Sequence, residues 1–324
     1  MTMQQTPLLL SRILGRGASL DPDVEVVTAQ AGGTTHRQTL GKTWERANQV
    51  AHALKGHGIE VGDRVASFMW NNYRHLELYQ GVPSMGVVLH TLNVRLSPTD
   101  LEYIINHAND RVIFADEDIL PLLEPIWDKV PCVELLVICR HGEGGASSFK
   151  NQIDYEDFIK DQPTCYDWPE IDENSPMGLC YTSGTTGKPK GVMYTHRSTY
   201  LHTMAGCLTD ALGLTALDSL LGIVPMFHAM GWGLPFNASM LGCKHVMPHR
   251  FMTPDTFLKL MHDEGGTIAT GVPTIWQGGK AAVEAADGKF DLRKLARLTC
   301  GGSAPPVPVM GWEWAGLAPA VILV

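Results

Sequence analysis

The chain has 324 residues, which is long enough for about two domains or for one large domain with subdomains. Hydrophobic residues make up 44% of the sequence and charged residues 18%, which indicates a globular protein and excludes a disordered one. The formal net charge of −9 argues against the basic face that nucleic acid or an anionic membrane would require, so we expect neither as a partner.

The cysteines and the N-terminus favour a cytoplasmic location. The seven cysteines are scattered and none forms a C-x-x-C pair, so the sequence supports neither a disulfide framework nor a zinc site. The apolar run Leu8–Leu10 is followed by Ser11 and Arg12 and is too short for the core of a signal peptide. We therefore expect reduced thiols in the cytoplasm and no integral membrane segment.

The first half of the chain alternates helical and strand patterns. Apolar residues recur at helical spacing over Thr43–Leu54, and Gly56 follows where such a helix would end. Ser97 is a predicted helix cap, with Pro98 in the first turn and Asp100 three residues after the cap. In chain order we predict a helix at Thr43–Leu54, a strand at Arg64–Met69, a helix at Tyr73–Met85 interrupted near Pro83, and strands at Val87–Leu89, Arg111–Ala115 and Glu134–Ile138.

The second half continues this alternation. His141–Ser148 is the best linker candidate, and we place a soft subdomain boundary in the turn-rich segment Gln162–Pro176. The pattern predicts an α/β fold of two stacked α/β subdomains with mainly parallel sheets: residues 1–170, residues 171–306, and an atypical hydrophobic tail at 307–324. The predicted strands of this half are Met177–Tyr181, Leu220–Val224, Lys244–Met247, Thr267–Ala269 and Leu298–Cys300.

The most informative segment is Tyr181–Val192, which is YTSGTTGKPKGV. Its glycines let main-chain N–H groups turn toward an anion, its hydroxyls add donors, and its lysines add positive charge. Ordinary surface turns collect the same residues. However, the apolar flanks Met177–Tyr181 and Val192–Tyr194 predict two buried strands joined by a phosphate-binding loop.

The spacing of this loop excludes a Walker-type phosphate loop. A Walker loop has four residues between its first Gly and its Gly-Lys pair, and Ser or Thr follows the Lys. In this sequence two residues separate Gly184 from Gly187, and Pro189 follows Lys188. An NTPase or kinase of the Walker class is therefore disfavoured.

The loop resembles the signature loop of the adenylate-forming (ANL) superfamily, which includes acyl-CoA synthetases, luciferases and the adenylation domains of peptide synthetases. Three further segments resemble family segments in the expected order, namely PMFHAMGWG at Pro225–Gly233, GVPT at Gly271–Thr274 and GGSAPP at Gly301–Pro306. The resemblance extends from about Leu40 to Pro306. It implies the N-terminal domain of a fatty-acid or acyl-CoA synthetase.

The resemblance implies that the loop holds the β- and γ-phosphates of ATP while a carboxylate attacks the α-phosphate. Thr182 would also help to place Mg²⁺, which prefers oxygen ligands. Gly302, Ser303 and Ala304 would pack against the adenine, although a simple turn also explains them. The loop residues assigned to the nucleotide are Thr182, Ser183, Gly184, Thr185, Thr186, Gly187, Lys188 and Lys190.

The other segments are implied to line the acyl pocket. His228 would be the catalytic residue by positioning the substrate carboxylate, which is already ionised at neutral pH and needs no base. Trp232 follows four residues later, so it would share a face with His228 if the stretch is helical, and it would gate the acyl tunnel. Without the resemblance, both side chains would be assigned to core packing. Gly271, Val272 and Pro273 would complete the pocket, although a strand-to-helix turn also explains this Gly and Pro.

After Pro306 the sequence departs from the family. The family has a helix, a strand and a G-x-G-x-T-E motif there, whereas this chain has VPVMGWEWAGLAPAVILV without a clear helical or strand period. We expect a tail of foreign composition, such as a frameshift product, and the absence of the mobile C-terminal domain that helps to form the CoA tunnel. Interruption by Pro and Gly disfavours a membrane anchor.

The resulting prediction is an AMP-forming acyl-CoA ligase that uses ATP, Mg²⁺ and CoA and is impaired by truncation. No Asp stands at the start of the pocket to hold an α-amine, so a fatty or other aliphatic acid is favoured over an amino acid. The alternative is a non-catalytic fragment or pseudoenzyme that at most binds a nucleotide or an acyl ligand. The acyl chain length is not decided, and a homodimer stays open as the oligomeric state.

Overall fold

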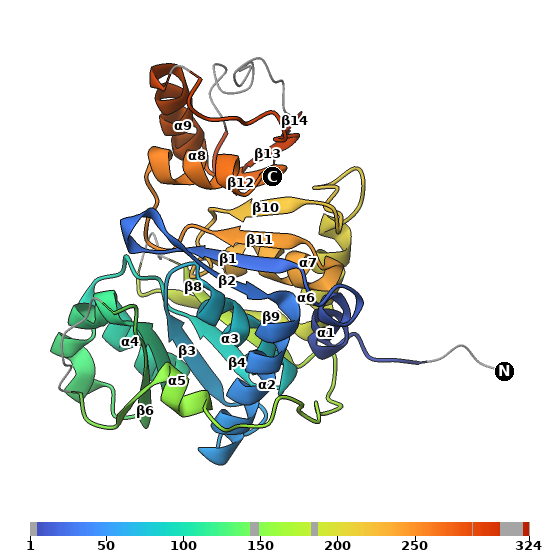
Figure 1. The fold of residues 1–324 in the computed structure, drawn as a ribbon. Helices are drawn as coiled ribbons and strands as arrows, with labels where there is room; N and C mark the ends of the chain where they lie inside the picture. Colours follow the sequence, from blue (N-terminus) through green and yellow to red (C-terminus); the bar gives the residue numbers. More distant parts are fainter. Residues whose placement is uncertain (1–4, 143–148, 183–186, 287, 305–319, 324) are drawn as a thin grey trace.

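Two seven-stranded β-sheets form the framework of the computed structural model (Figure 1). It describes residues 5–142, 149–182, 187–286, 288–304 and 320–323. Each sheet is parallel apart from one antiparallel pair at an edge. The predicted α/β class with mainly parallel sheets is therefore confirmed.

The first sheet takes its strands from residues 64–195 in the order β7-β6-β5-β3-β4-β8-β9. The central strands β3, β4 and β5 are almost wholly buried, as expected for parallel strands covered on both faces. The bounds are β3 (Arg64–Phe68), β4 (Val88–Thr91), β5 (Val112–Asp116), β6 (Leu135–Cys139), β7 (Gln152–Asp154), β8 (Pro176–Thr182) and β9 (Lys190–Thr195).

The strand predicted at Val192–Tyr194 is present, but the prediction that it is buried is wrong. This segment lies in β9, the edge strand of the first sheet, where Val192 is 41% and Met193 51% exposed. An edge strand has a neighbour on one side only, so its apolar side chains are less covered than those of β8.

The second sheet combines N-terminal strands with strands from the second half of the chain, in the order β14-β13-β12-β10-β11-β1-β2. Strands β1 and β2 were not predicted, and β2 has only partly buried or exposed residues. The bounds are β1 (Glu25–Ala29), β2 (Thr35–Thr39), β10 (Ser219–Gly222), β11 (Lys244–Met247), β12 (Ile268–Gly271), β13 (Arg297–Cys300) and β14 (Ala320–Leu323).

Sheet membership does not follow the predicted boundary at residue 170. Strands β8 and β9 belong to the first sheet because β8 pairs in parallel with β4. Strand β1 belongs to the second sheet because it pairs in parallel with β11. Both pairings join segments far apart in the chain, which a local pattern does not reveal.

The segment expected to be an atypical tail forms a strand over part of its length. Strand β14 pairs in parallel with β13, with Arg297 opposite Ala320 and Cys300 opposite Leu323. The sequence of this segment has no clear strand period, yet these four residues form a strand. Residues 305–319 lie outside the described part of the chain.

The helices form layers between and outside the sheets (Figure 1). One core cluster joins residues of α1, α2, α3 and α7 to both sheets, so these helices occupy the space between the sheets. A second cluster places α8 and α9 on the outer face of the second sheet, and a third places α4 on the first. The α-helices are α1 (Leu10–Leu20), α2 (Leu40–Gly56), α3 (Tyr73–Ser84), α4 (Pro98–Ala108), α5 (Tyr155–Ile159), α6 (His196–Gly206), α7 (Leu234–Leu241), α8 (Pro254–Asp263) and α9 (Pro273–Ala285).

Short 3₁₀ segments complete the described chain. They are η1 (Ala31–Gly33), η2 (Glu117–Leu122), η3 (Glu124–Lys129) and η4 (Ala229–Gly233).

Two local signals in the sequence are confirmed. The N–H of Asp100 donates to Ser97 Oγ at 3.2 Å, so Ser97 caps α4 as predicted. Pro83 lies in the last turn of α3, which ends one residue later. Within the described ranges, no helix is long and apolar enough to cross a membrane.

Candidate active site

The two ends of the phosphate loop are held by the β8–β9 pair. Thr182 is paired with Lys190, and the Thr182 hydroxyl lies 3.5 Å from the Lys190 carbonyl oxygen. Gly187, Lys188 and Lys190 are exposed, and Lys188 Nζ lies 4.7 Å from the ring centroid of Tyr103 on α4. The predicted residues Ser183, Gly184, Thr185 and Thr186 lie outside the described residues.

The segment containing His228 and Trp232 forms a left-handed turn rather than a regular helix. Positive φ values occur at Ala229 (46°), Met230 (50°), Gly231 (59°) and Trp232 (53°). The expectation that His228 and Trp232 share one face of a helix therefore does not apply. His228 is exposed, and its carbonyl oxygen accepts a hydrogen bond from the Gly231 N–H at 2.9 Å.

The strand that leads into the phosphate loop lies directly against this turn. A Cβ added to Gly178 on β8 would lie 3.0 Å from Met230 Cε, so the absence of a side chain there allows the close contact. Cys180 on the same strand is buried, and this burial raises the pKa of its thiol. The structure thus brings together the strand that precedes the predicted phosphate loop and the turn that was expected to contact the acid substrate.

A cavity of about 770 Å³ is lined by the same turn. Its wall also includes residues of α6, the start of α7, Thr299 of β13 and Gly302. Apolar side chains such as Met230, Leu234 and Phe236 make up much of its wall, while His202 adds a polar group. Trp232 also lines it. The other residues predicted for the acyl pocket, His228, Gly271, Val272 and Pro273, are not among the described residues of its wall.

Three of the predicted residues from separate segments, Trp232, Val272 and Gly302, lie close together beside this cavity. A Cβ added to Gly302 would lie 3.5 Å from Val272 Cγ1 and 4.0 Å from Trp232 Cζ2. The φ of Gly302 is +80°, which also favours glycine. The segment expected to contact adenine and the segments expected to contact the acyl chain therefore adjoin one another.

The remaining predicted residues surround this point. Gly271 ends β12, and its carbonyl oxygen accepts from the Gly301 N–H at 3.3 Å. Pro273 begins α9, where a helix tolerates its missing N–H. Ser303 and Ala304 are exposed after β13. The structure thus has a strand-to-helix turn at residues 271–273, as the alternative explanation of this Gly and Pro requires.

The sequence reasoning missed the residue that anchors this region. Asn71 is 4% exposed and lies after β3 of the first sheet. Its Nδ2 donates to the carbonyl oxygens of Gly222 at 3.0 Å and Val224 at 2.7 Å, and its Oδ1 accepts from the Met226 N–H at 2.7 Å. The only signal in the sequence is the pair Asn71 and Asn72, which begins two residues after the predicted strand Arg64–Met69.

Comparison with known sequences is in line with this geometry. A sequence model of the AMP-binding enzyme family matches residues 16–322. The medium-chain-fatty-acid–CoA ligase of Ectopseudomonas oleovorans is 40% identical over 309 residues, covering 95% of this chain and 56% of that protein. The long-chain-fatty-acid–CoA ligase of Thermus thermophilus is 39% identical over 305 residues, covering 94% and 54%. The chain thus spans about half the length of these curated relatives.

Solved structures share the fold. An anthranilate–CoA ligase in complex with anthranoyl-AMP superposes with a TM-score of 0.85 at 24% identity, covering 98% of this chain and 60% of that one. A long-chain-fatty-acid–CoA ligase of Archaeoglobus fulgidus superposes with a TM-score of 0.82 at 17% identity, covering 95% and 60%. Since the family match extends over residues 16–322, the chain belongs to the AMP-binding enzyme family.

Proposed function

We propose that this chain is the part of an AMP-forming acyl-CoA ligase that binds ATP and the carboxylic acid. The observation that supports this most directly is the position of the η4 turn. Met230 of the turn packs against β8, which leads into the predicted phosphate loop, and the turn also lines the 770 Å³ cavity. A nucleotide at the loop and an acid in the cavity would thus meet beside His228.

The proposed reaction joins a carboxylate oxygen to the α-phosphorus of ATP and breaks the bond to pyrophosphate, and CoA then displaces AMP. Lys188 and Lys190 would offset the negative charge of the leaving phosphates. The exposed Thr182 hydroxyl is an oxygen ligand of the kind that Mg²⁺ accepts. The bound ion would supply further positive charge to the phosphates. His228, exposed beside the turn, would orient the carboxylate.

The acid we propose for this cavity is a medium- or long-chain aliphatic acid. Its volume lies within the roughly 300–1,000 Å³ of small-molecule pockets, and its wall carries many apolar side chains. The curated relatives named above are medium-chain and long-chain ligases. Trp232 lines the cavity, and its Cζ2 lies 4.0 Å from a Cβ added at Gly302, which supports a role in limiting how far an acyl chain extends.

Binding of a non-hydrolysable acyl-adenylate mimic to the 324-residue chain tests this function. We expect a decanoyl-adenylate mimic to raise the midpoint of thermal unfolding and to bind more tightly than ATP or decanoate alone. Failure of both the mimic and ATP to bind at millimolar concentration would refute the proposal.

A matched pair of lysine variants locates the nucleotide. Lys188→Ala should weaken binding of ATP about tenfold, because it removes a cation beside the phosphates. Lys55→Ala is the control, since Lys55 also lies over an aromatic ring, 5.6 Å from the centroid of Tyr166, but belongs to α2. Equal losses in the two variants would show that Lys188 has no particular role.

A further inference from the structure

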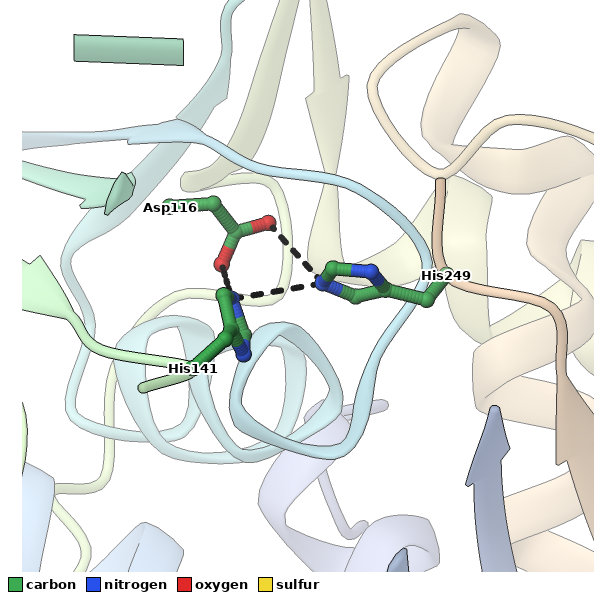
Figure 2. A group of neighbouring side chains, drawn as sticks. All are labelled: Asp116, His141 and His249. Carbon is green, nitrogen blue, oxygen red and sulfur yellow. Dashed lines mark hydrogen bonds and ion pairs between the residues drawn. The ribbon is translucent and has the colours of Figure 1, made fainter. Parts of the chain in front are cut away.

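A histidine pair and a carboxylate converge on one point away from the phosphate loop. His141 Nε2 lies 3.0 Å from Asp116 Oδ1 and 3.2 Å from His249 Nε2, and His249 Nε2 lies 3.9 Å from Asp116 Oδ2. Figure 2 shows the carboxylate and one nitrogen of each ring facing a common centre. Asp116 is fully buried and His249 is 4% exposed.

The three residues come from three strand ends in two sheets. Asp116 ends β5 and His141 follows β6 in the first sheet, while His249 follows β11 in the second. In the first sheet, β3 and β4 separate β5 from the phosphate-loop strand β8. The cluster therefore joins the two sheets and is distinct from the candidate active site.

The distances match those between ligands of one small divalent cation. Bonds of 2.0–2.2 Å from zinc to imidazole nitrogen and carboxylate oxygen place neighbouring ligand atoms of a tetrahedron about 3.3 Å apart. Two observed separations are close to that value, 3.0 Å from His141 Nε2 to Asp116 Oδ1 and 3.2 Å from His141 Nε2 to His249 Nε2. The 3.9 Å separation joins His249 Nε2 to the other carboxylate oxygen, Asp116 Oδ2. All three ligand atoms lie within 4.8 Å of one another. Little movement is needed to accept an ion.

The carboxylate is already fixed in place by hydrogen bonds. Asp116 Oδ2 accepts from the Trp70 N–H at 2.7 Å, and Asn72 Nδ2 contacts both carboxylate oxygens at 3.1 and 3.0 Å. The main chain beside His249 is held as well, because the His249 N–H donates to the Asn71 carbonyl oxygen at 2.9 Å. Such supporting contacts orient ligands in metal sites and raise affinity.

The nearby arginines are matched by other carboxylates. Arg250 lies 3.2 Å from Asp118, and Arg140 lies 2.9 Å from Asp154. Their positive charges are therefore offset close to the site. The negative charge of the Asp116 carboxylate then faces the imidazole rings of His141 and His249.

We propose that Asp116, His141 and His249 bind a divalent transition-metal ion of the Zn²⁺ class, which links the two sheets. Two imidazole nitrogens and one carboxylate oxygen form a ligand set that suits this class of ion. A small cavity of about 30 Å³, lined by His141, His249 and Tyr73, adjoins the site and has room for a water molecule as a fourth ligand. This proposal does not depend on the ligase function.

Titration of the chelator-treated protein with Co²⁺ tests the site. Co²⁺ should bind with a stoichiometry of one, give the visible absorption of a four-coordinate ion, and be displaced by Zn²⁺. The near-ultraviolet charge-transfer band of a thiolate ligand should be absent, because this ligand set contains no cysteine. Saturating Zn²⁺ should raise the midpoint of thermal unfolding by about 5 °C.

Ligand variants and a matched control complete the test. His141→Ala should lower the affinity for Co²⁺ more than tenfold, since loss of even a supporting contact costs roughly 10–100-fold. Its side chain is 15% exposed, so the variant should still fold. His249→Gln should have the same effect. His52→Gln is the control, because His52 bonds to the Cys165 carbonyl oxygen on the surface and should leave binding unchanged.

Two outcomes would overturn the proposal. The first is the absence of stoichiometric binding of Co²⁺ or Zn²⁺ to the unaltered chain. The second is binding that His141→Ala and His249→Gln leave intact, or that shows the thiolate band, because either would assign the ion to surface groups such as the exposed Cys165.

Discussion

Replacement of Asn71 by alanine should destabilise the protein more than any surface asparagine would. The variant removes hydrogen bonds of 3.0, 2.7 and 2.7 Å that connect Asn71 to the carbonyl oxygens of Gly222 and Val224 and to the N–H of Met226. An unpaired buried N–H costs about 1–3 kcal/mol, and each carbonyl oxygen that loses its partner adds about 1 kcal/mol. The free energy of unfolding should therefore fall by about 3–5 kcal/mol.

Urea denaturation followed by tryptophan fluorescence measures this loss. The main-chain bond from the His249 N–H to the Asn71 carbonyl oxygen persists in the variant, so the two sheets should stay joined and the folded state should remain populated. Asn174→Ala is the control, because Asn174 is exposed and its side chain bonds locally to Asp172. This variant should lower the free energy of unfolding by no more than about 0.5 kcal/mol. A loss below about 1 kcal/mol for Asn71→Ala would refute the reasoning.

Three further predictions concern pH, the glycine turn and the acyl cavity. Burial lowers the pKa of His75, His196 and His245 to about 4, so the unfolded chain takes up protons before the folded chain does as the pH falls. The free energy of unfolding should therefore fall by about 2 kcal/mol per histidine between pH 7 and pH 5. Urea titrations that show the same stability at both pH values would contradict this. Gly302→Val should weaken binding of the acyl-adenylate mimic, whereas Gly288→Val should not. Gly288 is the matched control, because its φ of +79° is similar and nothing lies within 4 Å of a Cβ added there. Calorimetry that finds equal affinities for the two variants would contradict this prediction. Trp232→Ala should change acyl chain-length preference, and an unchanged preference across a series of fatty acids would count against a gate.

Features that depend on neighbours in the sequence were predictable. The strand at Lys244–Met247 was predicted with its observed bounds, and Ser97 caps α4 because its side chain bonds three residues ahead. The family resemblance could be found in the sequence because the glycines, hydroxyls and lysines of Tyr181–Val192 are contiguous. Each of these signals lies within about one turn or one strand.

Features that depend on distant contacts were not predictable. The Asp116–His141 and His141–His249 pairs are separated by 25 and 108 residues, so no ligand spacing marks them. The anchoring role of Asn71 arises from contacts 151 to 155 residues away. The exposure of β9 follows from its place at the edge of the sheet, which its own apolar residues do not reveal.

The η4 turn gives a physical reason to regard the region as functional. Three non-glycine residues, Ala229, Met230 and Trp232, have positive φ values, and each costs about 1–2 kcal/mol. Contacts from outside the turn offset this cost, because Met230 packs against Gly178 and Asn71 holds the adjoining Met226. The turn places Met230 against β8 and, together with Trp232, in the wall of the cavity. The strained turn therefore lies between β8 and the cavity, where the nucleotide and acid sites are proposed.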